Sequence, residues 1–276
     1  MNARRLMMAA CLAAAVSPGA LAQQSMEATK QEQPYVSQQV KAELAPTGVL
    51  RAGLNLSNFL LINGKDATGG PTGVAPDMAA EIARRLGVPV KLVPYKTPGE
   101  LADAAETGAW DIGLIGAEPQ RAEKIAFTAA YVEIEATYLV PAGSPLKTLA
   151  DVDKPGVRIA VTGRSAYGLW LDRNIKHATL VKTDTLDTSY EKFVGDKLEA
   201  LAGLRPRLLS DVAKLPGARI LDGKFAAVQQ AIGTGRKNAA GADFLRKFVE
   251  EAKASGFVQG LIDKHKVRGL TVAPPG

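Results

Sequence analysis

The stretch DIGLIGAEPQRAEKIAFT, residues 111–128, presents one arginine where an apolar run breaks. The run ends at the small residues and proline of 116–119, and Arg121 follows before the chain turns apolar again. A guanidinium is planar and can donate two parallel hydrogen bonds to one carboxylate. A strand-to-helix turn also supplies backbone N–H groups and the positive end of a helix. Arg121 is therefore either an anion-binding residue or an ordinary arginine on the surface of a short helix.

Sequence signatures of hydrolases and metalloenzymes are absent from the chain. It contains no GxSxG, no HExxH, no Ser-His-Asp order and no cluster with zinc-ligand spacing. The two histidines, His177 and His265, lie among lysines or polar residues and are predicted to be on the surface. We therefore expect no metal and no cofactor. Glu118 or Asp187 could still act as a general acid, so catalysis remains an alternative.

The composition is that of a globular protein with room for two domains. The chain has 276 residues, of which 46% are hydrophobic and 22% charged. The formal charge of +6 is spread along the sequence and forms none of the basic runs that favour nucleic-acid binding. We expect no nucleic-acid partner.

The first 22 residues read as a secretory signal peptide. Two arginines precede an apolar run over 6–16, and Ala20-Leu21-Ala22 is a small-x-small cleavage pattern. The run is too short to span a bilayer. Cleavage after Ala22 would release the protein into the periplasm, where ATP and nicotinamide cofactors are not available. Cys11 could alternatively be a lipoprotein cysteine; otherwise the mature chain has no cysteine and forms no disulfide.

Beyond a polar lead-in over 23–45, strand and helix patterns alternate twice. A helix over 75–87 has apolar residues at helical spacing, with Asp77 as the expected cap and Gly87 as the stop. A second helical pattern, over 241–265, is amphipathic and is expected to fold back onto the first unit. The remaining predicted strands are 48–55, 88–95, 110–116, 156–161, 177–183 and 198–204. The remaining helices are 98–108 and 187–194, and residues 162–175 are predicted to form a turn followed by a helix.

This alternation predicts an α/β fold with mainly parallel sheets in two lobes and a cleft between them. The extended run over 125–144 joins the two units. We expect lobe 1 to comprise 46–138 and 232–276, and lobe 2 to comprise 139–231, so that two strands cross between the lobes.

Five segments from about Gly48 onward have the order and spacing of a known family: GVLRAGLN, GVAPDMAAEIARRLG, GAWDIGLIGAEPQRAEKIAFTAAY, GVRIAVTGRSAYGLWL and LDTSYEKF. The chain resembles the extracytoplasmic solute-binding proteins of ABC transporters in the polar amino-acid group, bacterial solute-binding protein family 3. The resemblance implies the type II periplasmic binding fold, in which two α/β lobes joined by two hinge strands close over one small ligand.

The resemblance also implies a set of ligand-binding residues. Arg121 matches the arginine that grips the ligand carboxylate, and Asp187 matches an aspartate that pairs with the ligand ammonium. Asp187 is equally a plausible helix N-cap. Arg164 and Ser165 match a turn that meets the carboxylate from lobe 2, with Arg164 as a second cation. The remaining matches are Asn55 and Asn58, which match lobe 1 contacts to the ligand side chain and are also common turn residues.

Several positions depart from the family pattern. Gly116 stands where amino-acid binders usually carry a serine or threonine that bonds the carboxylate, and Leu114 is bulkier than usual. Asn58, Phe59 and Leu60 lie where the aromatic lid is expected. Where the family commonly shows an aspartate, the chain gives Leu204-Arg205-Pro206-Arg207. The cleft is thus predicted to be richer in arginine and poorer in hydroxyls, which favours a carboxylate or other small anion over a standard amino acid.

The resulting hypothesis is a monomeric periplasmic receptor that delivers a small carboxylate-bearing solute, an amino acid or a related molecule, to an ABC permease in the inner membrane. One alternative is an exported dehydratase of the same fold, similar to cyclohexadienyl dehydratase. Another is a ligand-silent accessory protein with a filled cleft, which Leu114 and Leu60 would support.

Overall fold

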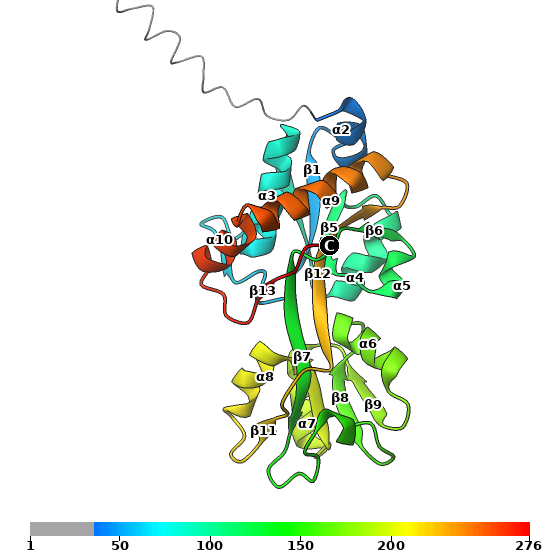
Figure 1. The fold of residues 1–276 in the computed structure, drawn as a ribbon, viewed down its shortest axis with the longest axis vertical. Helices are drawn as coiled ribbons and strands as arrows, with labels where there is room; N and C mark the ends of the chain where they lie inside the picture. The colour runs from blue at the N-terminus through cyan, green and yellow to red at the C-terminus, as the bar shows by residue number, and fades with distance from the viewer. Residues whose placement is uncertain (1–35) are drawn as a thin grey trace, which may run out of the picture. The chain divides into compact units, whose positions relative to one another are not determined.

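The computed structural model describes residues 36–276 (Figure 1). The predicted signal peptide and the first part of the predicted lead-in, up to residue 35, lie outside the described residues. The last part of the lead-in is helix α2 (Gln38–Leu44), which Ser37 caps. Its buried Leu44 packs against helix α9 (Ala239–Ala254).

Two groups of parallel strands form the centres of two lobes, which we call lobe 1 and lobe 2. Lobe 1 surrounds the parallel strands β4, β1 and β5, and lobe 2 surrounds the parallel strands β10, β8 and β9. The bounds in lobe 1 are β1 (Leu50–Asn55), β4 (Val90–Tyr95) and β5 (Ile112–Gly116), and in lobe 2 β8 (Arg158–Thr162), β9 (Thr179–Thr183) and β10 (Ala200–Leu204).

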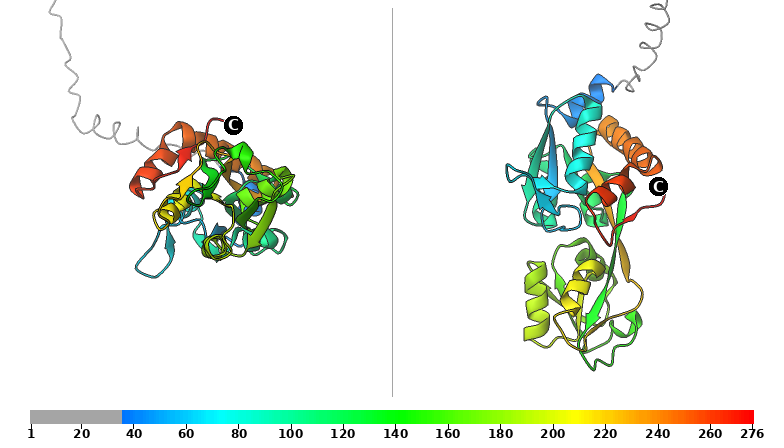
Figure 2. Two further views of the ribbon diagram at one scale, coloured as in Figure 1. Left: turned by 90° about the horizontal axis from the view of Figure 1, so that it is seen from below. Right: turned by 90° about the vertical axis from the view of Figure 1, so that its left-hand side faces the viewer.

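Two long strands join the lobes. β7 (Val132–Val140) and β12 (Ala226–Gly235) pair with each other in antiparallel register and run from one lobe into the other, as Figures 1 and 2 show. β12 continues the sheet of lobe 1 through β5, and β7 continues the sheet of lobe 2 through β10. The short strands β6 (Ile125–Phe127), β11 (Arg219–Ile220) and β13 (Thr271–Val272) pair with β12 or β7, and β2 (Gly64–Lys65) pairs with β3 (Pro71–Thr72).

Helices cover the faces of both sheets because each carries one apolar face. In lobe 1 the largest core packs the buried face of α3 (Val74–Leu86) against β1, β5 and α9, through residues such as Met78, Ile82 and Leu86. The other helices of lobe 1 are α4 (Pro98–Asp103) with a 3-10 turn (Ala104–Glu106), α5 (Pro119–Ala122) and α10 (Phe257–Lys264). Lobe 2 contains a 3-10 turn (Leu149–Asp151), α6 (Ala166–Asn174), α7 (Leu186–Gly195) and α8 (Arg205–Val212).

Most of the predicted elements are present, but three helices differ from their predictions, and α8, β2 and β3 were not predicted. Helix α3 stops at Gly87 as predicted, but its N-cap is Gly73, and Asp77 lies within the first turn and bonds to α10 instead. The helix predicted over 98–108 is α4 followed by a 3-10 turn. The predicted single C-terminal helix is wrong, because Gly256 adopts φ +75° and separates α9 from α10. An L-residue in that left-handed conformation carries a steric penalty, which glycine avoids.

Among the residues that the structure describes, no helix is both long and apolar enough to cross a bilayer.

Candidate functional site

A cavity of about 100 Å³ lies between the lobes, at the ends of their parallel strands. β1, β5, β8 and β10 each contribute their last residue to its wall, and residues that directly follow β4 and β9 complete it. The crevice outside the carboxyl ends of strands is where open α/β sheets bind ligands. The lining residues are Asn55, Ser57, Asn58, Lys96, Thr97, Pro98, Gly116, Arg121, Thr162, Gly163, Ser165, Ala166, Tyr167, Asp184, Thr185, Leu186, Leu204, Val228 and Gln230.

Arg121 is the buried cation of this cavity. It lies on the short helix α5 and is only 5% exposed. Its guanidinium donates to the backbone oxygen of Gly116 at 2.7 Å in its own lobe and to that of Arg164 at 2.8 Å across the cleft. A guanidinium has five N–H donors, so three remain, and the buried Nε has no partner in the part of the chain that the structure describes. Arg121 thus links the lobes and still has donors to offer.

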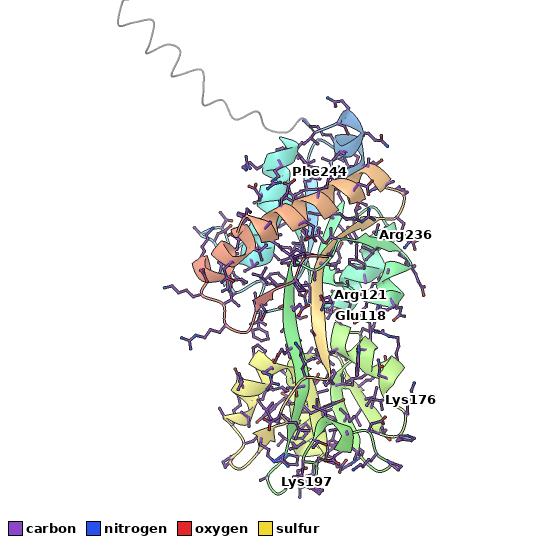
Figure 3. The ribbon with its side chains drawn as sticks, in the orientation of Figure 1. Glu118, Arg121, Lys176, Lys197, Arg236 and Phe244 are labelled. Atoms are coloured by element: carbon purple, nitrogen blue, oxygen red, sulfur yellow. The ribbon has the colours of Figure 1, made fainter. Side chains whose placement is uncertain are left out.

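The charge of Arg121 is not neutralised by an ion pair within residues 36–276. Burial lowers its pKa to about 10, while the nearby Glu118 favours the charged form. At neutral pH the side chain is still a full cation. Glu118 belongs to another pair: its largely buried carboxylate accepts from Arg173 of lobe 2, and burial raises its pKa despite that bond. Figure 3 shows Arg121 and Glu118 on the side of lobe 1 that faces lobe 2.

Gly116 lets the two lobes approach closely. A Cβ at this position would lie 2.9 Å from the Cβ of Ala166 in lobe 2 and 3.4 Å from Val228 of β12. A contact under 3.0 Å is closer than side chains tolerate, so something would have to move. Ala166 thus occupies the space into which a serine or threonine side chain at position 116 would project.

The polar residues around the cavity also shape its loops. Asn55 accepts hydrogen bonds from the backbone and hydroxyl of Ser57, and the buried Asn58 accepts one from the backbone of Leu60. Ser165 caps helix α6 by accepting from Gly168 at 3.0 Å. The first N–H groups of a helix lack intrahelical partners, so the start of α6 adds positive polarity to the cavity wall.

Five of the seven sequence-predicted site residues line the cavity, and two do not. Asn55, Asn58, Gly116, Arg121 and Ser165 come together there, from both lobes.

Asp187 and the side chain of Arg164 lie elsewhere because other charges hold them. Asp187 is 78% exposed in its side chain and pairs with Arg207 at 2.7 Å. Arg164 adopts φ 58°, which turns its carbonyl toward Arg121, while its guanidinium binds Asp103 at 2.6 Å.

The expected excess of arginine in the cleft is also absent from the lining. Arg205 pairs with Glu135, and Arg207 pairs with Asp187 and with the buried Asp211. These guanidiniums therefore have carboxylate partners of their own. His265 is half-buried against Asp77, so its predicted surface position is also wrong.

Several lining residues were missed by sequence reasoning, although a signal for them existed. Lys96 and Thr97 follow a predicted strand directly, and so does Asp184; Thr162 follows another. Because the carboxyl ends of parallel strands meet at one edge of a sheet, the first polar residues after each strand were candidates. Tyr167, Val228 and Gln230 gave no such signal, since their place depends on helix and strand packing.

Residues 58–267 match the bacterial extracellular solute-binding proteins, family 3. The chain belongs to this family. In a search of curated protein sequences, none matched this family 3 protein.

Three of the solved structures with a similar fold are binding proteins. A mutant of ArgBP from T. maritima is 24% identical, covers 83% of this chain and 100% of its own, and superposes with a TM-score of 0.67. A putative ABC-transporter binding component from Wolinella succinogenes, complexed with lysine, is 23% identical over 80% and 97% of the two chains, with a TM-score of 0.67. An ancestral amino-acid-binding protein, AncCDT-1, a precursor of cyclohexadienyl dehydratase, is 22% identical over 81% and 97%, with a TM-score of 0.65. The predicted two-lobed periplasmic-binding-protein fold is therefore confirmed.

In this family 3 protein, the two leucines that would support a filled cleft are core residues. Leu114 is 2% exposed within the core of lobe 1. Leu60 is 5% exposed and packs with residues of β7 and lobe 2, including Ile134 and Tyr138. Neither lines the cavity.

Proposed function

We propose that this family 3 protein is the substrate-binding component of an ABC importer, which captures a small carboxylate-bearing solute in the periplasm and delivers it to the membrane permease. The observation that carries the proposal is the buried, unneutralised Arg121 in a cavity lined by both lobes. A buried charge is costly unless it is paired. A ligand carboxylate supplies the missing partner.

The ligand-binding residues in this proposal are those that line the cavity. Arg121 donates to the carboxylate with its free N–H groups, and the start of α6 at Ser165 supports the same charge. Asn55 and Asn58 present amides from lobe 1, and Gly116 leaves room for the lobes to close. Such receptors need no cofactor, and we expect this one to act as a monomer.

Binding explains the site better than catalysis does. The two candidate acids, Glu118 and Asp187, do not line the cavity, and each is held by an arginine. A general acid must reach the reacting atoms within hydrogen-bond distance. The raised pKa of Glu118 follows from burial beside Arg173 and needs no catalytic role.

The test is a thermal-shift screen of the purified protein against amino acids, 2-oxo acids, dicarboxylates and aromatic acids. A ligand that binds only the folded state raises Tm. Arg121→Ala should abolish the rise in Tm, because removing one partner of a buried ion pair weakens binding by about 2–5 kcal/mol.

Arg246→Ala is the matched control, since it removes an exposed arginine of lobe 1 that pairs only with Asp243. It should keep the full shift. A ligand that still raises Tm in Arg121→Ala would contradict the proposed role of Arg121 as the carboxylate-binding residue. If no compound raises Tm in the wild type, an accessory role is favoured.

A further inference from the structure

The charged side chains of the cavity wall are mainly cationic: Arg121 and Lys96 face one carboxylate, that of the exposed Asp184. The Nε of Arg121 has no partner. The hydroxyl of Tyr167 is buried beside Thr162 and Ser165 without a well-aligned hydrogen bond. Lys96 is the second cation of the wall, and it forms no ion pair among the described residues. Arginine and lysine donate hydrogen bonds and cannot accept them.

An α-amino acid carries its ammonium on the carbon next to the carboxylate. If Arg121 binds the carboxylate, the ammonium must therefore find an acceptor close to Arg121. An ammonium that leaves water without such a partner loses its solvation with no compensation.

Neither Asp187 nor Glu118 supplies that acceptor. Asp187 is largely exposed and is held by Arg207, and Glu118 is held by Arg173. Asp184, the carboxylate that does line the cavity, is exposed to solvent.

Apolar side chains form part of the cavity wall. Leu204, the last residue of β10, lines the cavity and is 7% exposed. Ala166 and Val228 also line it, and both lie within contact distance of a Cβ at Gly116, beside the guanidinium of Arg121. Ala166 and Val228, beside Arg121, therefore offer no carboxylate that could pair with a ligand ammonium.

We propose that the site selects small carboxylates without an α-ammonium group, with 2-oxo and 2-hydroxy acids as the class that fits best. An oxo or hydroxyl oxygen beside the carboxylate can accept from the Nε of Arg121 or from Tyr167, whereas an ammonium can only donate. The inference rests on the proposed binding function, and it names the ligand class of that same site.

The experiment is isothermal titration calorimetry of the purified protein with matched ligand pairs that differ only at Cα. The pairs are pyruvate and alanine, 2-oxobutyrate and 2-aminobutyrate, 2-oxoglutarate and glutamate, and phenylpyruvate and phenylalanine. We expect at least one 2-oxo acid to bind, with a Kd at least tenfold lower than that of its amino acid. An amino acid that binds equally well or better would overturn the inference and leave the binding function intact. Failure of all eight ligands to bind would overturn the inference, whereas the binding function itself would be overturned only by failure of the whole thermal-shift screen.

A variant pair then tests the acceptor argument directly. Leu204→Asp places a carboxylate at the end of β10 and should narrow or reverse the preference for the oxo acid. Leu204→Ile, which adds neither a charge nor an acceptor, should retain the preference. Equal preferences in Leu204→Asp and wild type, with both proteins folded by circular dichroism, would contradict the role of Leu204.

Discussion

At the scale of single residues, the contact between Gly116 and Ala166 sets how far the cleft can close. No side chain separates β5 of lobe 1 from the start of α6 in lobe 2 at this point, and Arg121 bridges the same gap. A serine or threonine at position 116 would clash with Ala166, so the glycine is explained by the close approach of the lobes as well as by a difference in the ligand.

Gly116→Ala should weaken ligand binding at least tenfold, because its Cβ would meet that of Ala166 at 2.9 Å. The double variant Gly116→Ala with Ala166→Gly should recover most of the affinity, since it removes the opposing methyl group. Calorimetry with a ligand found in the screen measures both variants. Equal weakening in the single and double variants would show that the contact does not limit closure.

At the scale of elements, the carboxylate of Asp77 connects α3 to the C-terminal end of α10. Asp77 accepts hydrogen bonds from Lys264 and from His265, each at 2.7 Å. Partial burial would by itself raise the pKa of Asp77, but these hydrogen bonds outweigh it and hold the pKa below its ordinary value. The bonded carboxylate is therefore more stable in the folded state than in the unfolded chain.

The contribution of Asp77 to stability should be lost in acid. A carboxyl whose pKa is lowered by folding stabilises the fold above its unfolded-state pKa, about 3.9, and loses this effect as the pH falls through the folded-state value. Asp77→Asn should lower the free energy of unfolding by about 0.5–1 kcal/mol at pH 7 and by less below pH 4. Urea titrations at both pH values measure this.

Asp263→Asn is the control for this prediction, because Asp263 is exposed on α10 and bonds only within its own helix. It should change stability little at either pH. A pH-independent loss in Asp77→Asn would contradict the assigned titration.

At the scale of the whole described unit, ion pairs join the two lobes across the cleft. Arg164 binds Asp103 in a pair whose side chains are 59% and 65% exposed. Arg173 binds Glu118, whose side chain is only 9% exposed. Exposed pairs contribute little and are screened by salt, whereas a buried carboxylate that loses its partner carries a desolvation penalty.

Arg173→Ala should therefore open the lobes more than Arg164→Ala does. We expect the first change to shift the closed-to-open balance by about 1–3 kcal/mol and the second by less than about 1 kcal/mol. Small-angle X-ray scattering without added ligand should show a larger radius of gyration for Arg173→Ala. Equal radii for the two variants would contradict the greater weight given to the buried pair.

The sequence by itself determined the fold class, most of the elements and the position of Arg121, because these depend on local periodicity and on motif order along the chain. It misjudged the C-terminal helix only where Gly256 allows a left-handed turn. Local pattern is sufficient wherever neighbouring residues decide the conformation.

Only the tertiary structure decided which charged side chains remain free for a ligand. Asp187 and Arg164 resemble site residues in sequence, yet Arg207 and Asp103 hold them outside the cavity. Leu204 and Val228 became part of its wall because strands from two lobes converge there. An ion pair depends on partners that lie far apart in sequence, so no local pattern reveals which charges are already neutralised.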